Sequence, residues 1–196
     1  MLHSLFRRTW LKRAILAALA VWAVLVLCPR PAAAQAQPNG PAEFSGEEVM
    51  LEGKPILFIP GKATWDRAFP TLTEKFRTIA AFLRDNNLAA AGPMMTIYTK
   101  VGDREFEFHA AVPLAEPPPS QPRGGAIRSG QSPVGKALKF VHRGSYDSMD
   151  MLYETITHYL DGKRIERAGV FFEEYVTDPL ATPEDQLVVN VFVLVQ

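Results

Sequence analysis

Two stretches of this chain have the same order of predicted elements, and this repetition limits the fold more than any other feature of the sequence. Residues 136–196 contain a strand, a turn at Gly144 and Ser145, an amphipathic helix and two apolar strands. Residues 54–112 contain an apolar run, a helix and two further strands in the same order. The repeated order predicts an α+β fold built from tandem duplicated β-α-β-β units.

The helix of the first unit has a sequence signal for its start. Thr71 and Glu74 have the spacing of a capping box, in which Thr caps the helix and Glu follows three residues later. Apolar residues then recur at helical spacing as far as Leu83. The pattern favours a helix that begins at Thr71. An earlier start near Trp65 stays open, although Pro70 stands against an unbroken helix from there.

In the two closing strands, alternation indicates which side chains share a face. Phe171, Glu173 and Tyr175 lie on one face of their predicted strand. Asn190 shares a face of the last strand with Phe192. If it is buried, an amide in so apolar a strand needs a hydrogen-bond partner, which either the backbone or a ligand would supply.

The first 34 residues have the three parts of a secretory signal peptide. Basic residues without any acid precede an apolar run from Ala14 to Cys28, and small residues follow at a suitable cleavage site. The run is shorter than the ~20 residues of a spanning helix, so an uncleaved membrane anchor is the less favoured alternative. We expect a periplasmic or secreted bacterial protein whose mature chain begins near Gln35 or Gln37. Twin arginines at positions 7 and 8 leave the twin-arginine route open beside the general secretory route.

Charge and cysteine content narrow the class of protein further. The predicted leader holds five of the 21 basic residues and none of the 21 acidic residues, so the mature chain has a net charge of −5. Because nucleic-acid binding needs a basic face, we expect no nucleic-acid partner. Cys28 is the only cysteine and lies in the leader, so the mature domain is expected to rely on its own core without disulfides.

Two segments have the composition of connectors. Residues 35–53 are rich in Gln, Pro, Gly and Glu and lack periodicity, which predicts a flexible N-terminal tether. Residues 113–135 are rich in Pro and Gly and separate repeat 1 (54–112) from repeat 2 (136–196). A connection this long is either a flexible linker, which we favour, or a lid over a pocket.

Several short motifs, taken in order, resemble a known family. Gly92-Pro93 leads to Tyr98, His142-x-Gly144-x-Tyr146 forms the turn into the second helix, and Glu173-x-Tyr175 is followed by Asp178-Pro179. This set resembles the GyrI-like domain, which is the small-molecule-binding module of AraC-type and other bacterial transcription activators. The resemblance covers residues 54–196 and implies an antiparallel sheet with a cleft between the two repeats.

The resemblance also implies where a ligand would bind. The expected binding residues, which would meet at the junction of the repeats, are Tyr98, Tyr146, Glu173, Tyr175 and Asn190. Aromatic side chains around a carboxylate suit a planar, partly aromatic molecule. Family members usually carry an acid where this chain has Asn190, so we expect neutral aromatic ligands to bind at least as well as cations.

The expected partner is therefore a small molecule, with no nucleic acid and, once the leader is removed, no membrane. We predict no cofactor, no catalytic residues and no metal site, because the histidines lack the spacing of metal ligands. Two alternatives stay open. Some relatives of the family are hydrolases that use a pocket Glu, so Glu173 beside Tyr175 keeps hydrolysis open. SOUL-type haem-binding proteins have a related architecture, so His109, His142 and the Met94-Met95 pair keep haem binding open.

Overall fold

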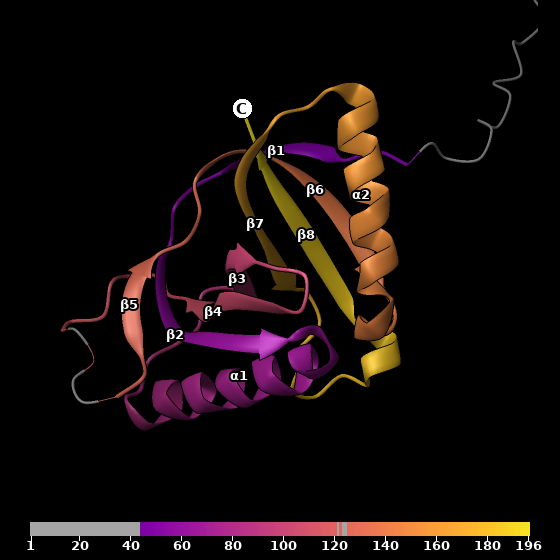
Figure 1. Cartoon of the computed structure of the whole chain (residues 1–196). Helices are drawn as coiled ribbons and strands as arrows, with labels where there is room; N and C mark the ends of the chain where they lie inside the picture. Colours follow the sequence, from indigo (N-terminus) through magenta and orange to yellow (C-terminus); the bar gives the residue numbers. More distant parts are fainter. Residues whose placement is uncertain (1–43, 121, 123–124) are drawn as a thin grey trace, which may run out of the picture. The chain divides into compact units, whose positions relative to one another are not determined.

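A computed structural model describes residues 44–120, 122 and 125–196, and the predicted leader therefore lies outside the described residues. The described chain forms two α-helices and eight β-strands (Figure 1). The first part contains β1 (Glu47–Leu51), β2 (Pro55–Thr64), α1 (Ala68–Asp85), β3 (Met94–Val101) and β4 (Glu105–Pro113). The second part contains β5 (Arg128–Gln131), β6 (Gly135–Arg143), α2 (Met149–Lys163), β7 (Arg167–Tyr175) and β8 (Val188–Val195).

The predicted duplication is present in the order of the strands. All eight strands form one antiparallel sheet in the order β1-β6-β8-β7-β3-β4-β2-β5. Each repeat contributes three strands with its third strand in the middle: β2, β4 and β3 in repeat 1, and β6, β8 and β7 in repeat 2. The two repeats meet where β3 pairs with β7. The α+β prediction with side-by-side repeats is therefore confirmed.

Beyond the repeats, one long two-stranded ribbon joins the two ends of the sheet. β1 pairs with β6, from Glu47 opposite Lys139 to Leu51 opposite Gly135. β2 pairs with β5 and continues this register as far as Phe58, which lies opposite Arg128. Between these pairings, Ser132 N–H donates to the carbonyl of Lys54 (2.9 Å). The three residues that link β1 to β2 span at most about 15 Å, whereas six strand spacings in a flat sheet would need about 29 Å. The sheet therefore curves so that its ends approach each other.

The ribbon corrects two predictions about the connectors. Residues 47–51, which the sequence placed in the flexible tether (35–53), form β1 instead. Residues 128–131, which it placed in the linker (113–135), form β5. Both strands are short, with five and four residues, and their partners are distant in the sequence, so no local pattern identifies them.

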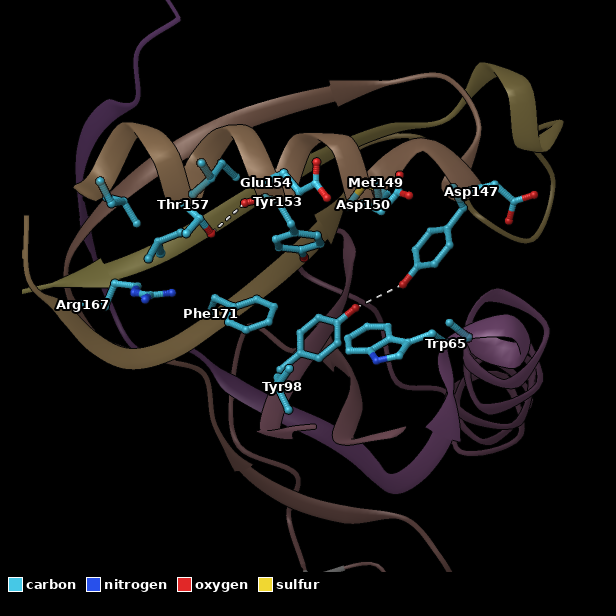
Figure 2. Close-up of a pocket in the computed structure, with 16 residues that line it drawn as sticks. Trp65, Tyr98, Asp147, Met149, Asp150, Tyr153, Glu154, Thr157, Arg167 and Phe171 are labelled. Atoms are coloured by element: carbon cyan, nitrogen blue, oxygen red, sulfur yellow. Dashed lines mark hydrogen bonds between the residues drawn. The ribbon is translucent and has the colours of Figure 1, made fainter. Parts of the chain in front are cut away.

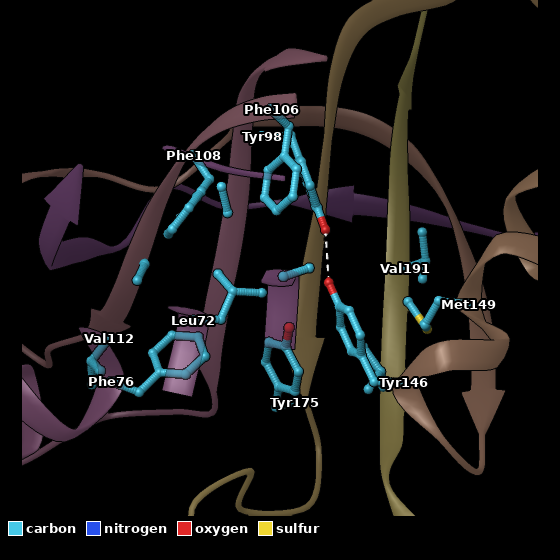
Figure 3. Close-up of a cluster of buried hydrophobic side chains, with 14 of the residues drawn as sticks. Leu72, Phe76, Tyr98, Phe106, Phe108, Val112, Tyr146, Met149, Tyr175 and Val191 are labelled. Carbon is cyan, nitrogen blue, oxygen red and sulfur yellow. Dashed lines mark hydrogen bonds between the residues drawn. The ribbon is translucent and has the colours of Figure 1, made fainter. Parts of the chain in front are cut away.

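The core on the helix-covered face is rich in aromatic side chains. Both helices contribute buried residues to it, including Leu72 and Phe76 from α1 and Met149 from α2 (Figure 3). The start favoured for the first helix, Thr71, is wrong, and the earlier alternative near Trp65 is closer, because the 3₁₀ helix Trp65–Arg67 leads directly into α1. α1 begins at Ala68, and the Thr71 hydroxyl donates back to the Arg67 carbonyl (2.6 Å) rather than capping the helix.

A second, smaller core lies on the opposite face of the sheet. Alternate residues of the central strands form it, namely Ile56, Met95, Ile97, Ala111, Phe172 and Phe192, and Val49 and Leu51 of β1 pack against them. These six side chains are at most 7% exposed although neither helix contributes to this cluster. The curvature of the sheet, with β1 drawn toward the centre, accounts for their burial.

Candidate functional site

A buried carboxylate on β7 is the centre of the site. Glu173 is fully buried and faces the helices. Its Oε1 accepts hydrogen bonds from the hydroxyls of Tyr98 (2.8 Å) and Tyr153 (2.7 Å), and its Oε2 accepts one from Tyr175 (2.7 Å). The hydroxyl of Tyr146 lies 3.1 Å from that of Tyr98. Four of the chain's five tyrosines thus converge on one acid.

The fold brings these side chains together at the junction of the repeats. Thr96 of β3 lies directly opposite Glu173 of β7, so Tyr98, two residues along, is on the same face as the acid. Tyr175 is two residues from Glu173 on its own strand, and its hydroxyl lies 3.3 Å from that of Thr96. Tyr153 comes from α2, which passes over this face (Figure 2).

The turn before α2 positions Tyr146. The backbone at Gly144 has a φ of +116°, a conformation that favours glycine. Ser145 follows, and its hydroxyl accepts from the N–H of Asp147 (3.3 Å), which caps the short 3₁₀ helix Tyr146–Ser148. Nε2 of His142 lies 2.9 Å from the Ser145 carbonyl and holds the other side of the turn.

Burial and hydrogen bonding act in opposite directions on the acidity of Glu173. Loss of solvent raises the pKa of this carboxyl, whereas the hydrogen bonds from Tyr153, Tyr175 and Tyr98 favour the charged form and limit the rise. Burial, together with the Glu173 charge, raises the pKa of the four tyrosine hydroxyls well above 10. The tyrosines therefore keep their protons at neutral pH and act as donors.

A cavity of about 590 Å³ opens above this network. Its walls are mostly apolar and aromatic, and they come from both repeats. Repeat 1 contributes Trp65, Ala68, Tyr98 and Val101. Repeat 2 contributes five polar residues and the apolar or aromatic residues Tyr146, Met149, Tyr153, Ile156, Leu160, Phe171 and Val193. The ring of Phe171 stacks on that of Tyr98, with centroids 4.5 Å apart. The size and lining are those of a small-molecule site.

The charged groups of the cavity wall are unevenly distributed. Asp147, Asp150 and Glu154 carry negative charge along the start of α2, and Arg167 on β7 is the only basic residue among the lining side chains. In Figure 2 Arg167 lies beside Phe171, at the end of the cavity away from Asp147. The cavity is therefore acidic at one end and basic at the other.

Of the five residues predicted for the site, four meet and one does not. Tyr98, Tyr146, Glu173 and Tyr175 form the network described above. Asn190 lies on the opposite face of the sheet, directly across from Glu174, to which it is hydrogen bonded. It is therefore separated from the cavity by the sheet itself.

Sequence reasoning missed most of the cavity lining, including the aromatic residues Tyr153, Phe171 and Trp65. Tyr153 was expected on the apolar face of the second helix. The only sequence signal for a place in the site is its spacing of seven residues from Tyr146, about two helical turns, which puts both side chains on one side of the helix. Phe171 shares the face of Glu173, so alternation could have placed it in the site. Trp65 precedes α1, and no local pattern connects it with the second repeat.

The fold and this site define the class of protein: a duplicated, helix-covered sheet with an aromatic cavity at the junction of its repeats. Residues 47–196 match the model of the GyrI-like small molecule binding domain. The chain belongs to this family. No curated protein matches it at a significant level.

Solved structures share the fold at low sequence identity. The EcmrR chain of an EcmrR–DNA complex matches with a TM-score of 0.66 and 11% identity over 77% of this chain, which spans 57% of that chain. A hydrolase from Listeria innocua matches with a TM-score of 0.53 and 10% identity over 78% of this chain and 92% of its own. SAV2435, solved bound to tetraphenylphosphonium, matches with a TM-score of 0.53 and 12% identity over 78% of this chain and 94% of its own.

Neither α1 nor α2, the helices of the described residues, is long and apolar enough to cross a membrane.

Proposed function

We propose that the cavity at the repeat junction binds a small, partly aromatic cation. The observation that carries this proposal is the buried Glu173, which lies beneath aromatic walls that include Tyr98 and Tyr153. In its deprotonated form, a carboxylate in a low-dielectric site attracts a cation strongly, and aromatic faces add a cation–π contribution.

The position of Asn190 changes the expectation about ligand charge. The expectation that neutral ligands bind at least as well as cations rested on Asn190 replacing a pocket acid. Because Asn190 lies on the opposite face, the acid that matters is Glu173, and Asp147, Asp150 and Glu154 add negative charge to the wall. A cationic ligand fits this charge distribution better than a neutral one.

A structural neighbour supports the same class of ligand. SAV2435, which shares the fold, was solved with tetraphenylphosphonium, an aromatic cation. This cation is therefore a suitable probe, and triphenylphosphine oxide is a neutral compound of similar shape.

A single tryptophan allows a direct test. Of the chain's three tryptophans, two lie at positions 10 and 22 within the predicted leader, so Trp65 is the only one in the mature chain. Trp65 lines the cavity, stacked on Phe106 with centroids 4.4 Å apart. Titration of a chain that begins at Gln37 with tetraphenylphosphonium should change Trp65 fluorescence saturably, and triphenylphosphine oxide should bind at least about tenfold more weakly. Equal affinities for the two compounds would contradict the proposal.

The geometry supports binding better than hydrolysis. Both oxygens of Glu173 already accept tyrosine hydrogen bonds, and the carboxylate lies below the cavity wall rather than in it. A general base needs a lone pair within reach of substrate. The haem alternative lacks converging ligands among the described residues, since His109 packs on Phe58 and His142 binds Ser145.

We also propose that the chain is exported, on the strength of the leader pattern in residues 1–34. N-terminal sequencing of the protein from the native cell should find a start near Gln35 or Gln37. Recovery of membrane-bound protein with Met1 intact would reject cleavage.

A further inference from the structure

The strands of the two repeats separate beside the cavity. β3 and β7 pair only from Met94–Tyr175 to Ile97–Phe172. Beyond this point β3 has an irregularity between Tyr98 and Lys100 in its pairing with β4. Bulges of this kind bend a strand and redirect its side chains.

β7 has a matching irregularity in its pairing with β8. The register shifts between Arg167 and Phe171, so this end of β7 follows β8 and not β3. The sheet is therefore open between β3 and β7 just where the aromatic cavity lies against it.

A second cavity of about 410 Å³ occupies this opening. It shares five lining residues with the first cavity, namely Tyr98, Val101, Arg167, Phe171 and Val193. Since the two cavities have these walls in common, a ligand in the first can extend into the second past Phe171.

The second cavity has the opposite charge from the first. Its charged lining residues are Arg167 and Lys100, with no acid among them. The guanidinium of Arg167 makes no hydrogen bond or ion pair with any described residue, although its planar fork can hold a carboxylate with two parallel hydrogen bonds. Lys100 is only loosely paired, with its Nζ 3.9 Å from Glu107.

We propose that the site selects amphoteric aromatic ligands, whose cationic ring system occupies the first cavity over Glu173 while an anionic group lies in the second cavity at Arg167 and Lys100. This inference rests on the proposed function, because it takes cation binding in the first cavity as given. It adds the requirement that the ligand carry an anionic group, which the buried Glu173 alone does not impose.

The physical reason is complementarity at both ends. A simple cation satisfies Glu173 and leaves Arg167 hydrated and unpaired. A ligand with a carboxylate at the far end pairs with Arg167 as well, at a position that is solvent-exposed and therefore contributes modestly. We expect a gain of about three- to tenfold in affinity from the anionic group.

Rhodamine B and its ethyl ester test this requirement. They share one cationic ring system, but the acid is a zwitterion at neutral pH and the ester is a cation. Affinities for both dyes are measured by fluorescence anisotropy on the chain beginning at Gln37, for wild type, Arg167→Gln and Lys100→Gln. Arg143→Gln is the matched control, because it removes the same charge from an exposed position of β6 outside both cavities.

We expect wild type and Arg143→Gln to prefer the zwitterion by about three- to tenfold. Arg167→Gln should abolish that preference by weakening binding of the zwitterion, whereas the ester should bind no more weakly than in wild type, because the substitution removes a positive charge from the wall of the first cavity. Added salt should reduce the preference in wild type. Tight binding of the ester with no preference for the zwitterion would overturn this inference and leave the proposed function standing. Failure of both dyes and of tetraphenylphosphonium to bind would overturn both.

Discussion

Glu173 and Glu174 are neighbours in the chain and lie on opposite faces of the same strand. Glu173 is buried under the helices among tyrosine hydroxyls, whereas Glu174 is paired with Asn190 on the other face. Burial raises the pKa of both carboxyls, but only Glu173 adjoins the aromatic cavity. The two acids therefore form a matched pair of sites for substitution.

Replacing Glu173 with Gln should weaken cation binding at least tenfold. The change keeps the shape of the side chain and removes its charge, and losing one partner of a buried charge pair costs about 2–5 kcal/mol. Glu174→Gln should change the affinity for tetraphenylphosphonium by less than about twofold. Calorimetric titration measures both, and equal effects of the two substitutions would place the ligand elsewhere.

The stability of the unliganded protein should depend on pH through Glu173. Because burial raises its pKa above the ordinary value of 4.5, the folded state holds this proton more tightly than the unfolded state does. The associated stabilisation is complete below pH 4.5 and is lost as the pH rises through the folded-state pKa. We therefore compare the melting temperatures of wild type and Glu173→Gln at each pH. The difference, wild type minus variant, should become smaller as the pH rises from 4.5. A difference that grows with pH would show that the hydrogen bonds outweigh desolvation.

Tyr153→Phe should shift the pH dependence of cation binding to higher pH. The Tyr153 hydroxyl stabilises the charged form of Glu173, so its removal raises the pKa of the carboxyl further. The loss of this bond amounts to about 1–3 kcal/mol. Tyr159→Phe is the control, because Tyr159 packs on Phe140 and lies outside the network. Identical pH profiles for the two variants would refute a role for Tyr153 in setting the charge.

Asn190→Asp should leave ligand affinity unchanged. This substitution restores an acid where related domains were expected to have one, but it does so on the face away from the cavity. Its effect should appear in stability instead, because a second carboxylate opposite Glu174 introduces repulsion. A tighter complex with tetraphenylphosphonium would contradict the placement of Asn190.

Removing β1 should destabilise the domain. A chain that begins at Gly53 loses the pairing of residues 47–51 with β6 and the packing of Val49 and Leu51 on the second core. Compared with a chain that begins at Pro41, it should unfold at lower denaturant concentration, with a loss of at least about 2 kcal/mol from the two apolar side chains alone. Equal stability would restore the tether interpretation.

The sequence predicts the duplication and the contacts along β7, because both depend on local periodicity. Alternation correctly places Glu173 and Tyr175 on one face. The error at Asn190 has a physical cause: β7 and β8 bury apolar side chains on both faces, so the pattern does not show which face the helices cover. Asn190 was assigned to the site with no means of relating its face to that of Glu173.

Trp65 shares a cavity with side chains of the second repeat, and β1 and β5 pair with distant strands, so the positions of all three depend on long-range strand pairing in the sheet. Curvature is set by long-range strand pairing and bulges, and these leave no short-range signal in the sequence. The place of the cavity at the repeat junction, its central acid and three of the tyrosines around that acid were predicted, whereas most of the cavity lining was not.

The ribbon that runs from β1 into β2 has a consequence for how the chain could be divided. Three strand pairings join the part of the chain before the 113–127 connection to the part after it, namely β1 with β6, β2 with β5 and β3 with β7. A break between Ala115 and Glu116 would therefore yield two fragments with four strands each, and neither would contain the whole sheet. Such fragments would form the aromatic cavity only when they associate with each other. Ligand binding and association of the fragments would therefore strengthen each other, which is the behaviour that a split sensor requires.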